Sequence, residues 1–446
     1  MGINSLKAPS RRLVGLELPV NKAKADVMHI DLNSCFAIIE QQANHLLRGR
    51  PVGVAAYDTP RGFVLAASYE AKAYGVKLGV NVQQARQLCP HIIIMTPDPS
   101  KYREAHKRFK ELLFEYTDDV TPKSIDEFVI HLDNAPAYRA GVPGEVLGFE
   151  MKQKIYERLG EAVTVNVGLG PNRFLAKLAA GLHKPNGLDT ITHENLFAVY
   201  GSLELMDLPG INVRYNARLQ AHGIHTVMDF FNASEEYLRK AVFKSVVGRY
   251  WYLRLRGYEP DRREFDRKNI GHQHAIKMAT ADPDELRRIL MKLCEKTGRR
   301  LRKNELYAGG IALWVSFSNS RQHWQITGGS AMTDGRQGWH HSEKVGARLY
   351  ATTDIYAHAC RLLEQAQVVE PVRLMAVSTF DLHPWDPEQL DLFGDARGYL
   401  AAKRVSDALD IVNNRYGEYV VAPATMMGMK GEVLDRIAFG NVRDLY

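Results

Sequence analysis

Three carboxylates lie beside short apolar runs that are typical of β-strands. Asp31 follows the run 27–30, and the pair Asp126 and Glu127 precedes the run 128–132. Two such strands lying side by side would bring the three negative side chains to one place on a sheet. Carboxylates that close repel one another and need cations, and their hard oxygens, together with those of a phosphate, favour Mg²⁺. The spacing therefore indicates two-metal phosphoryl transfer, although ordinary strand-end acids would have the same sequence.

The segments around these acids predict the elements that hold them. Residues 26–40 have the pattern of a strand running into a helix, and residues 51–95 that of a small insert with two short strands and a helix. Residues 101–117 carry apolar side chains at helical spacing. A β-rich run at 162–170 is followed by a helix over 172–182. We therefore expect the acids on strands of a mixed α/β domain with helices beside them.

The second half of the chain changes character twice. Residues 192–258 contain only helical patterns, and residues 259–270 are charged, interrupted by proline and poor in core residues, as in a linker. Beyond the linker we expect a β-α-β-β-α-β order, whose first helix is the basic segment 284–305. The other elements of that order are expected at His272–Met278, Ala308–Phe317, Gln322–Thr327, Thr353–Gln365 and Val372–Phe380.

The composition is that of a large globular protein without disulfides. A chain of 446 residues exceeds the size of one core, so several domains are expected. No run approaches the roughly 20 apolar residues of a membrane span, and residues 1–20 lack the apolar stretch of a signal peptide. The four cysteines lie far apart without zinc-site spacing, which indicates reduced thiols. We expect a cytoplasmic protein that does not bind membranes.

The charge distribution favours an anionic partner. The formal net charge is +7 and the isoelectric point about 9.0. Residues 1–25 carry five basic side chains and one acidic one, whereas residues 383–446 carry seven basic and ten acidic ones. The predicted helix 284–305 has eight Lys or Arg residues against four acids. It is either a solvated helix face or a surface that follows phosphates.

Two turns could bind phosphate. The helix over 172–182 ends in a Lys-Pro-Asn-Gly turn that exposes Lys184, which could neutralise a triphosphate, although an isolated lysine is more often a plain surface charge. Leu208-Pro209-Gly210-Ile211 is similar to the hairpin of a helix-hairpin-helix, in which backbone N–H groups point at a DNA phosphate. Asn212 stands where a second glycine is usual, and a plain helical hairpin is the alternative.

A short peptide in the acidic tail could bind another protein. The segment 389–393 places apolar anchors within a region rich in proline and acids, where they could fill a pocket on a partner. A peptide this short also occurs by chance.

In their order along the chain, these motifs resemble the Y-family (translesion) DNA polymerases, with features similar to both the bacterial polymerase IV and polymerase V branches. The resemblance covers about residues 26–415. The motifs that carry it are Asp31–Phe36 and Ser124–Glu127 for the metal site, Tyr69–Val76 for the fingers, and Gly168–Gly187 for the palm.

The resemblance implies an α/β multidomain protein with the right-hand polymerase architecture: an α+β palm with a mixed or antiparallel sheet, small fingers, a helical thumb and a β-α-β-β-α-β little finger. Its implied boundaries are a basic N-terminal extension at 1–25, palm at 26–34 and 98–191, fingers at 35–97, thumb at 192–258, linker at 259–270, little finger at 271–382, and a C-terminal tail at 383–446.

The resemblance also implies roles for individual residues. Two Mg²⁺ ions, with Mn²⁺ as an alternative, would be held by Asp31, Asp126, Glu127 and the carbonyl of Leu32. The incoming nucleotide would meet Phe36 as steric gate, with Cys35, Tyr69, Lys72 and Lys184 around it. DNA would contact Gly210, Ile211, Asn212, Arg299 and Arg300. A bacterial sliding clamp would bind Gln389, Leu390, Asp391, Leu392 and Phe393.

Four positions depart from the usual family pattern. Asn33 replaces an aspartate that is usually not a metal ligand, so activity is not put in doubt. Cys35 stands where an aromatic residue is common, which implies a looser pocket beside the gate. Lys72 replaces an arginine and loses its bidentate fork on phosphate. Asn212 slightly weakens the assignment of the thumb hairpin.

The function implied is template-directed, low-fidelity DNA synthesis past damaged bases, without proofreading, as part of DNA repair and the SOS response. Primer-template DNA, deoxynucleoside triphosphates and the sliding clamp would be the partners of a monomer at the nucleoid, with accessory mutagenesis proteins as additional candidates. A non-catalytic scaffold that binds DNA and clamp is the main alternative. A nuclease or other phosphotransferase with the same metal pair is a weaker one.

Overall fold

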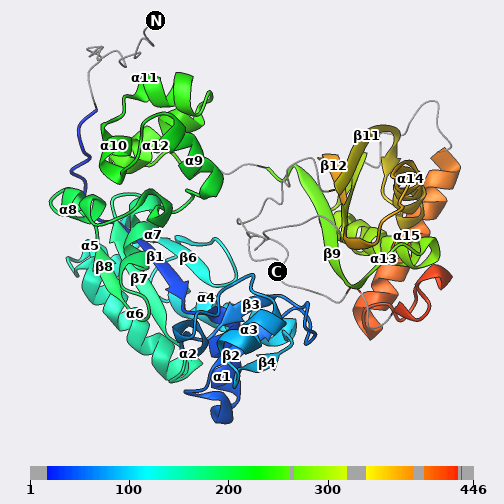
Figure 1. The fold of residues 1–446 in the computed structure, drawn as a ribbon, viewed down its shortest axis with the longest axis horizontal. Coiled ribbons are helices and arrows are strands. Elements are labelled where there is room, and N and C mark those ends of the chain that lie inside the picture. The colour runs from blue at the N-terminus through cyan, green and yellow to red at the C-terminus, as the bar shows by residue number, and fades with distance from the viewer. Residues whose placement is uncertain (1–17, 262–265, 319–337, 385–395, 430–432, 434–446) are drawn as a thin grey trace, which may run out of the picture. The chain divides into compact units, whose positions relative to one another are not determined.

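The computed structural model describes residues 18–261, 266–318, 338–384, 396–429 and 433. The chain divides into two compact units between residues 264 and 265, within the segment expected as a linker. We call them the first unit and the second unit (Figure 1). The limits expected for palm, fingers, thumb, little finger and tail stay predictions.

The centre of the first unit is a five-stranded sheet in the order β5-β6-β1-β7-β8. Strand β1 lies between β6 and β7 and is antiparallel to both, while β7 and β8 are parallel. The strands of this sheet are β1 (Val27–Leu32), β5 (Val120–Pro122), β6 (Glu127–His131), β7 (Val165–Gly170) and β8 (Leu188–Thr190). The expected pairing of the two acid-bearing strands is confirmed.

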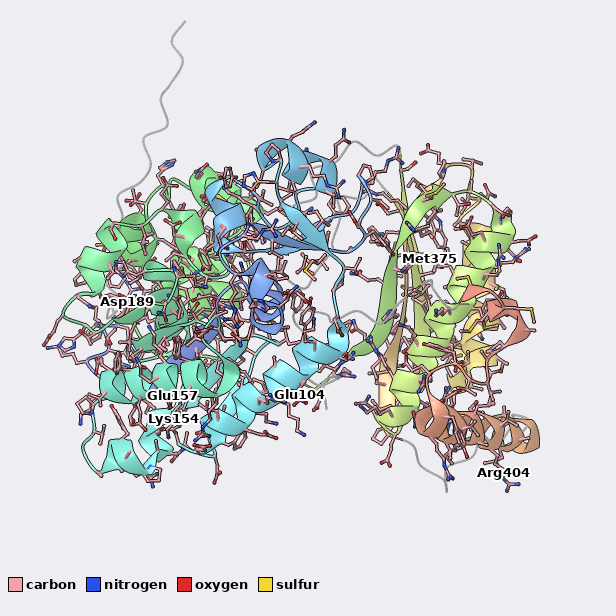
Figure 2. All side chains as sticks on the ribbon, turned by 90° about the horizontal axis from the view of Figure 1, so that it is seen from below. Glu104, Lys154, Glu157, Asp189, Met375 and Arg404 are labelled. Carbon is pink, nitrogen blue, oxygen red and sulfur yellow. The ribbon has the colours of Figure 1, made fainter. Side chains whose placement is uncertain are left out.

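Helices cover both faces of this sheet (Figure 1). Apolar side chains of α4 and α6 pack with Met28 and Ile30 in one core, whereas Val27 and Val129 pack with Ala176 of α7. The side chains of Glu104 on α4 and Glu157 on α6 are exposed, away from that core (Figure 2). The helices on the sheet are α4 (Pro99–Phe114), α5 (Pro136–Arg139), α6 (Gly144–Leu159) and α7 (Arg173–Leu182).

Gly168 shows how closely α7 approaches the sheet. A Cβ on Gly168 would lie 2.1 Å from the Ala176 carbonyl oxygen and 2.1 Å from the Ala180 nitrogen. Gly168 and Gly170 therefore lie within β7 and admit the helix, and the strand-to-helix turn expected there is made by Pro171 and Asn172. Asn172 caps α7 by accepting a hydrogen bond from the Leu175 amide at 2.7 Å.

A second, three-stranded sheet in the order β3-β2-β4 forms the insert expected at residues 51–95. Its strands are β2 (Val52–Ala55), β3 (Val64–Ala67) and β4 (Ile93–Met95). The helices next to it in the chain are α1 (Cys35–Ala43), α2 (Tyr69–Ala73) and α3 (Val82–Leu88). Asn81 and Gln84 form a capping box that fixes the start of α3.

The end of the first unit is helical, as the sequence predicts for 192–258. Its helices are α8 (Leu196–Gly201), α9 (Val213–Ala221), α10 (Val227–Asn232), α11 (Glu235–Tyr237) and α12 (Val247–Leu255). Residues 18–25 pack against the end of α12. The backbone amide of Asn21 donates to the Arg256 carbonyl at 2.8 Å, and its side-chain Nδ2 donates to the Gly257 carbonyl at 2.9 Å. The chain thus crosses from this helical region directly into β1.

The second unit is a four-stranded antiparallel sheet in the order β11-β10-β12-β9, packed against α13 and α14. Its elements are β9 (Asn269–Thr280), α13 (Pro283–Lys303), β10 (Leu306–Phe317), β11 (Gly338–Leu349), α14 (Thr352–Gln365), β12 (Val372–Pro384) and α15 (Ala396–Tyr416). Met375 of β12 lies in this core, while Arg404 of α15 is exposed (Figure 2).

The β-α-β-β-α-β order is present, with one difference. The strand expected at Gln322–Thr327 lies outside the described residues, and the third strand is instead Gly338–Leu349. That segment is rich in polar residues and mostly half-exposed or exposed, so it lacks the alternating apolar pattern that marks a strand in a sequence. Within the described residues, no helix is long and apolar enough to cross a bilayer.

Candidate active site

The register of β1 and β6 brings the predicted acids together. Asp31 is the Cα partner of Glu127 across the antiparallel pair. Residues directly opposite in such a pair point to the same face of the sheet, which here is the face covered by α7. The Leu32 amide donates to the Asp126 carbonyl at 2.9 Å, so the third acid adjoins the other two.

Two lysines and one serine contact these acids. Lys177 of α7 donates to both carboxylate oxygens of Glu127, at 2.8 and 2.7 Å. Lys184, in the turn after α7, forms an ion pair with Asp31. The Ser124 hydroxyl donates to Asp126. Each acid therefore has a hydrogen-bonding partner, and for Asp31 and Glu127 that partner is a cation.

The three carboxyl groups influence one another. Burial, followed by the neighbouring charges of Asp31 and Glu127, raises the pKa of Asp126 to about 6, although the Ser124 hydrogen bond opposes the shift. Burial also raises the pKa of Asp31 in spite of Lys184. For Glu127, burial would raise the pKa, but Lys177 and the other nearby cations outweigh it and lower the pKa. The group thus carries more negative charge than its lysines neutralise.

A buried histidine lies behind the acids. His29 is close to Glu127, with 4.0 Å between Nε2 and a carboxylate oxygen, and burial lowers its pKa to about 3. Within the described part of the chain neither ring nitrogen has a hydrogen-bond partner. His29 is therefore neutral and adds no positive charge to the site.

The donor set suits a hard divalent cation. Carboxylate oxygens are the ligands that Mg²⁺ prefers, and burial, followed by repulsion from Asp31, raises the pKa of Asp126, a repulsion that a bound cation would relieve. Among the described residues, however, no group of three or more His, Cys, Asp or Glu side chains is arranged to hold a metal. Asp31 and Glu127 are turned to Lys184 and Lys177 instead. The metal ligands therefore stay a prediction.

The side chain predicted as steric gate is part of the core beside the acids. Phe36 is 2% exposed, and its ring stacks on Tyr102 with 4.3 Å between the centroids. The hydroxyl of Tyr102 donates to Glu40 at 2.8 Å, which fixes the ring beneath Phe36. Burial raises the pKa of the neighbouring Cys35 thiol, which is therefore a neutral, small wall residue.

The residues predicted to bind triphosphate gather beside Asp31. Lys72 donates to the Ser34 hydroxyl at 2.7 Å, and its ammonium lies 4.2 Å from the centre of the Tyr69 ring. Burial, followed by the charge of Lys184, lowers the pKa of Lys72. A cavity of about 430 Å³ opens here, lined by Ser34 and Tyr69 among other residues. Lys72 and Tyr69 thus lie together near Asp31, and the cavity next to them is lined by Tyr69 and Ser34 but by neither Lys72 nor Lys184.

The residues predicted to contact DNA have structural roles as well. Gly210 has a φ of +94°, and Asn212 caps α9 by accepting a hydrogen bond from the Tyr215 amide at 3.0 Å, which accounts for asparagine in place of glycine there. Ile211 is buried.

In the second unit, Arg299 is held by Asn414, Glu418 and Asp410 of the C-terminal segment. Arg300 donates to the Gly271 carbonyl at 2.8 Å. Their contacts with DNA stay a prediction, and the predicted clamp peptide 389–393 lies outside the described residues.

Residues 30–181 match the impB/mucB/samB family, and residues 267–392 match the C-terminal domain of that family. A DNA polymerase IV of Moorella thermoacetica is 35% identical over 408 residues, which are 90% of this chain and 96% of the relative. The chain belongs to the Y family of DNA polymerases. A DNA polymerase IV of Staphylococcus epidermidis is 30% identical over 370 residues, covering 82% of this chain and 98% of that protein.

Solved Y-family structures share the fold. A Y-family DNA polymerase chimera of Dbh and Dpo4 superposes with a TM-score of 0.66 at 24% identity, covering 80% of this chain and 99% of the other. An insertion ternary complex of Dbh DNA polymerase superposes with a TM-score of 0.51, also at 24% identity and with the same coverage. The right-hand α/β polymerase fold expected from the sequence is confirmed.

Two features of this Y-family member were not predicted from its sequence. Lys177 lies on α7, whereas Lys184 lies in the turn after that helix, so no helical spacing relates the two, and the sequence carried no signal that Lys177 faces the acids. A basic cavity of about 710 Å³ lies between α11 and the start of α12, and its lining residues are Glu235, Arg239, Lys240, Lys244, Ser245, Val246 and Arg249. Its members come from a short helix, a π-helical turn, a loop and the start of α12, so no single period marks them.

Proposed function

We propose that the protein is a template-directed DNA polymerase of low fidelity that synthesises DNA past damaged bases. The observation that carries this proposal is the antiparallel register that sets Asp31 opposite Glu127, with lysines from α2 and from α7 and its following turn around the same face. Such a site combines a negative centre, which needs divalent cations, with positive groups for the phosphates of a substrate.

Asp31, Asp126, Glu127 and the Leu32 carbonyl would hold two Mg²⁺ ions. When bound, these ions supply the charge that lowers the pKa of a primer 3′-hydroxyl and stabilises the departing pyrophosphate. Ser124 orients Asp126 through its hydrogen bond, and burial keeps the carboxylates poorly solvated, so their attraction for a divalent cation is strong.

The remaining residues of the site would hold and select the nucleotide. Lys184 and Lys72 bring two positive charges to the position of a triphosphate, and the Tyr69 hydroxyl adds a hydrogen-bond donor. Phe36, fixed by its stacking on Tyr102, would occupy the space that a ribose 2′-hydroxyl needs. The insert with β2, β3 and β4 is small, so it would check the shape of the new base pair weakly and tolerate lesions.

DNA would be held through its backbone. The Gly210 hairpin offers amide donors, and the basic cavity between α11 and α12 offers cationic side chains, neither of which reads sequence. The peptide 389–393 would bind a bacterial sliding clamp and confer processivity. No proofreading activity is proposed, and the protein would act as a monomer at the nucleoid.

Primer extension with Mg²⁺ tests the proposal and separates it from a non-catalytic scaffold that binds DNA and clamp. The wild-type protein should extend an undamaged primer, and more so when the clamp is present. Asp126→Asn should lower extension by at least about 1,000-fold, because a charged metal ligand becomes neutral. Glu104→Gln, on the exposed side of α4, is the matched control and should extend normally.

A wild-type protein that binds primer-template yet adds no nucleotide would favour the scaffold. Extension by Asp126→Asn at the wild-type rate would remove the carboxylate assignment.

A further inference from the structure

A chain of buried amides connects the end of β1 with the turn after α7. Asn33 and Asn166 are 1% and 0% exposed. Asn33 Nδ2 donates to Asn166 Oδ1 at 2.7 Å, and Asn166 Nδ2 donates to the His183 carbonyl at 3.1 Å. Asn33 Oδ1 accepts hydrogen bonds from the Asn186 amide at 2.9 Å and from the Thr164 hydroxyl at 3.1 Å. The oxygen and the nitrogen of each buried side-chain amide thus both have a hydrogen-bond partner.

The direction of this chain is fixed by the backbone. The Asn186 amide can only donate, so Asn33 must face it with its oxygen. The nitrogen of Asn33 then points at Asn166, which must accept with its own oxygen and donate onward to the His183 carbonyl. An aspartate at position 33 could keep the acceptor but not the donor, which gives a physical reason for asparagine here.

The turn that receives these hydrogen bonds is also held from its other side. Lys152 of α6 donates to the carbonyls of Asn186 and Gly187, at 2.5 and 3.1 Å. The Val167 amide of β7 donates to the Gly187 carbonyl at 3.1 Å. Lys184 lies between the anchored residues 183 and 186, so its backbone has little freedom to move.

We infer that Asn33 is a positioning residue for the incoming nucleotide. It directly follows Asp31 and Leu32, and through Asn166 and the Asn186 amide it sets the distance from these two residues to Lys184. One side chain thereby aligns the predicted metal ligands with the predicted triphosphate ligand. The inference rests on the proposed function, because it takes Lys184 to bind the triphosphate.

Single-nucleotide incorporation kinetics test this coupling. Asn33→Ala should raise the KM for the incoming deoxynucleotide about 10- to 100-fold while kcat changes by less than about 3-fold, because a displaced Lys184 loses ground-state binding. Asn33→Asp should show the same direction with a smaller effect. The double variant Asn33→Ala/Lys184→Ala should be no worse than Lys184→Ala alone, since both changes remove one interaction.

The matched control is a buried asparagine in the other unit. Asn413 is 2% exposed and exchanges two hydrogen bonds with the backbone of Val421. Asn413→Ala should lose stability to a similar degree without changing the KM. An unchanged KM in Asn33→Ala, or effects of Asn33→Ala and Lys184→Ala that multiply, would overturn the inference. If Asn33→Ala does not fold, Asn33→Asp decides by the same criteria.

Amide hydrogen exchange gives a readout that does not depend on polymerase activity. The Asn186 amide should exchange slowly in the wild type and at least about 10-fold faster in Asn33→Ala, because its acceptor is gone. If Asn186 stays equally protected, Asn33 does not hold the turn, whether or not the protein polymerises. A wild-type protein with no polymerase activity would instead refute the proposed function, and the exchange result would still decide whether Asn33 fixes the turn.

Discussion

In the first unit Asp31 and Glu127 share one face of a sheet with Asp126 next to them, and these acids are only partly neutralised, whereas in the second unit the buried Arg302 is paired with acids. Arg302 of α13 is 4% exposed and bonds to Asp410, to the Tyr350 carbonyl and to the Thr352 hydroxyl. Lys177, which pairs with Glu127, is 44% exposed and can move. The comparison suggests that a buried ion pair such as Arg302–Asp410 stabilises the fold, whereas an exposed ion pair such as Lys177–Glu127 leaves its acid available to bind a ligand.

Removing Arg302 should destabilise the protein more than removing Lys177. Arg302→Ala should lower the free energy of unfolding of the second unit by about 3–5 kcal/mol, because the buried hydrogen bonds of Arg302 to Asp410, Tyr350 and Thr352 would be lost and Asp410 would keep only Arg299, at 3.7 Å. Lys177→Ala in the first unit should lower it by less than about 1 kcal/mol, since that lysine is largely solvated. Thermal or urea denaturation measures both. Equal losses in the free energy of unfolding would show that the two ion pairs contribute equally to stability.

The proposed selectivity for deoxynucleotides depends on an apolar side chain, Phe36, rather than on a charge. Phe36→Ala opens the space beside Tyr102, and incorporation of ribonucleotides should rise about 100-fold relative to deoxynucleotides, the scale on which pocket shape discriminates a small group. Competitive incorporation of dCTP and CTP measures the ratio. Tyr237→Ala, a half-exposed aromatic away from the site, serves as control. Unchanged discrimination in Phe36→Ala would remove its role as gate.

The unmatched acids should make the metal-free protein sensitive to pH. The pKa of Asp126 is raised from 3.8 to about 6, so the folded state holds a proton that the unfolded state releases. The free energy of unfolding should therefore fall as pH rises from about 4 to about 6, by an amount on the order of 2 kcal/mol. Asp126→Asn should flatten this fall, and Mg²⁺ should reduce it. Denaturation in EDTA at several pH values is the measurement.

The smallest effect is expected at the basic cavity. Lys244 has a φ of +51°, a left-handed backbone that glycine adopts more easily, and it has no ion-pair partner in the part of the chain that the structure describes. Lys244→Gly should leave stability unchanged or slightly higher, yet weaken binding of duplex DNA about 3- to 10-fold and reduce the salt dependence by about one charge. Fluorescence anisotropy at several salt concentrations measures this.

A control for that variant lies in the second unit. Glu305 has a φ of +54°, so Glu305→Gly relieves similar backbone strain without removing a cation, and binding should not weaken. If both variants bind DNA equally well, the cavity does not contact phosphate.

The sequence predicted the parts of this molecule that leave a local pattern. Short apolar runs placed β1 and β6, and the acids at their ends followed from them. Lys177 could not be predicted in the same way, because a lysine on a helix surface looks alike whether it meets water or Glu127. The amides of Asn33 and Asn166 are buried polar groups, which interrupt an apolar pattern without revealing their partners. The strand β11 is polar along its length and gave no alternation.

The hydrogen bonds between Asn21 and the end of α12 limit how far the helical region 192–258 can move relative to β1. Five residues lie between Asn21 and Val27, the first residue of β1, and the six Cα–Cα steps from Asn21 to Val27 span at most about 20 Å. The segment 22–26 is therefore a short connection that limits the distance between the end of α12 and β1. Any movement of the helices beyond that reach must first break the hydrogen bonds of Asn21, or else displace β1 and with it Asp31, the proposed metal ligand.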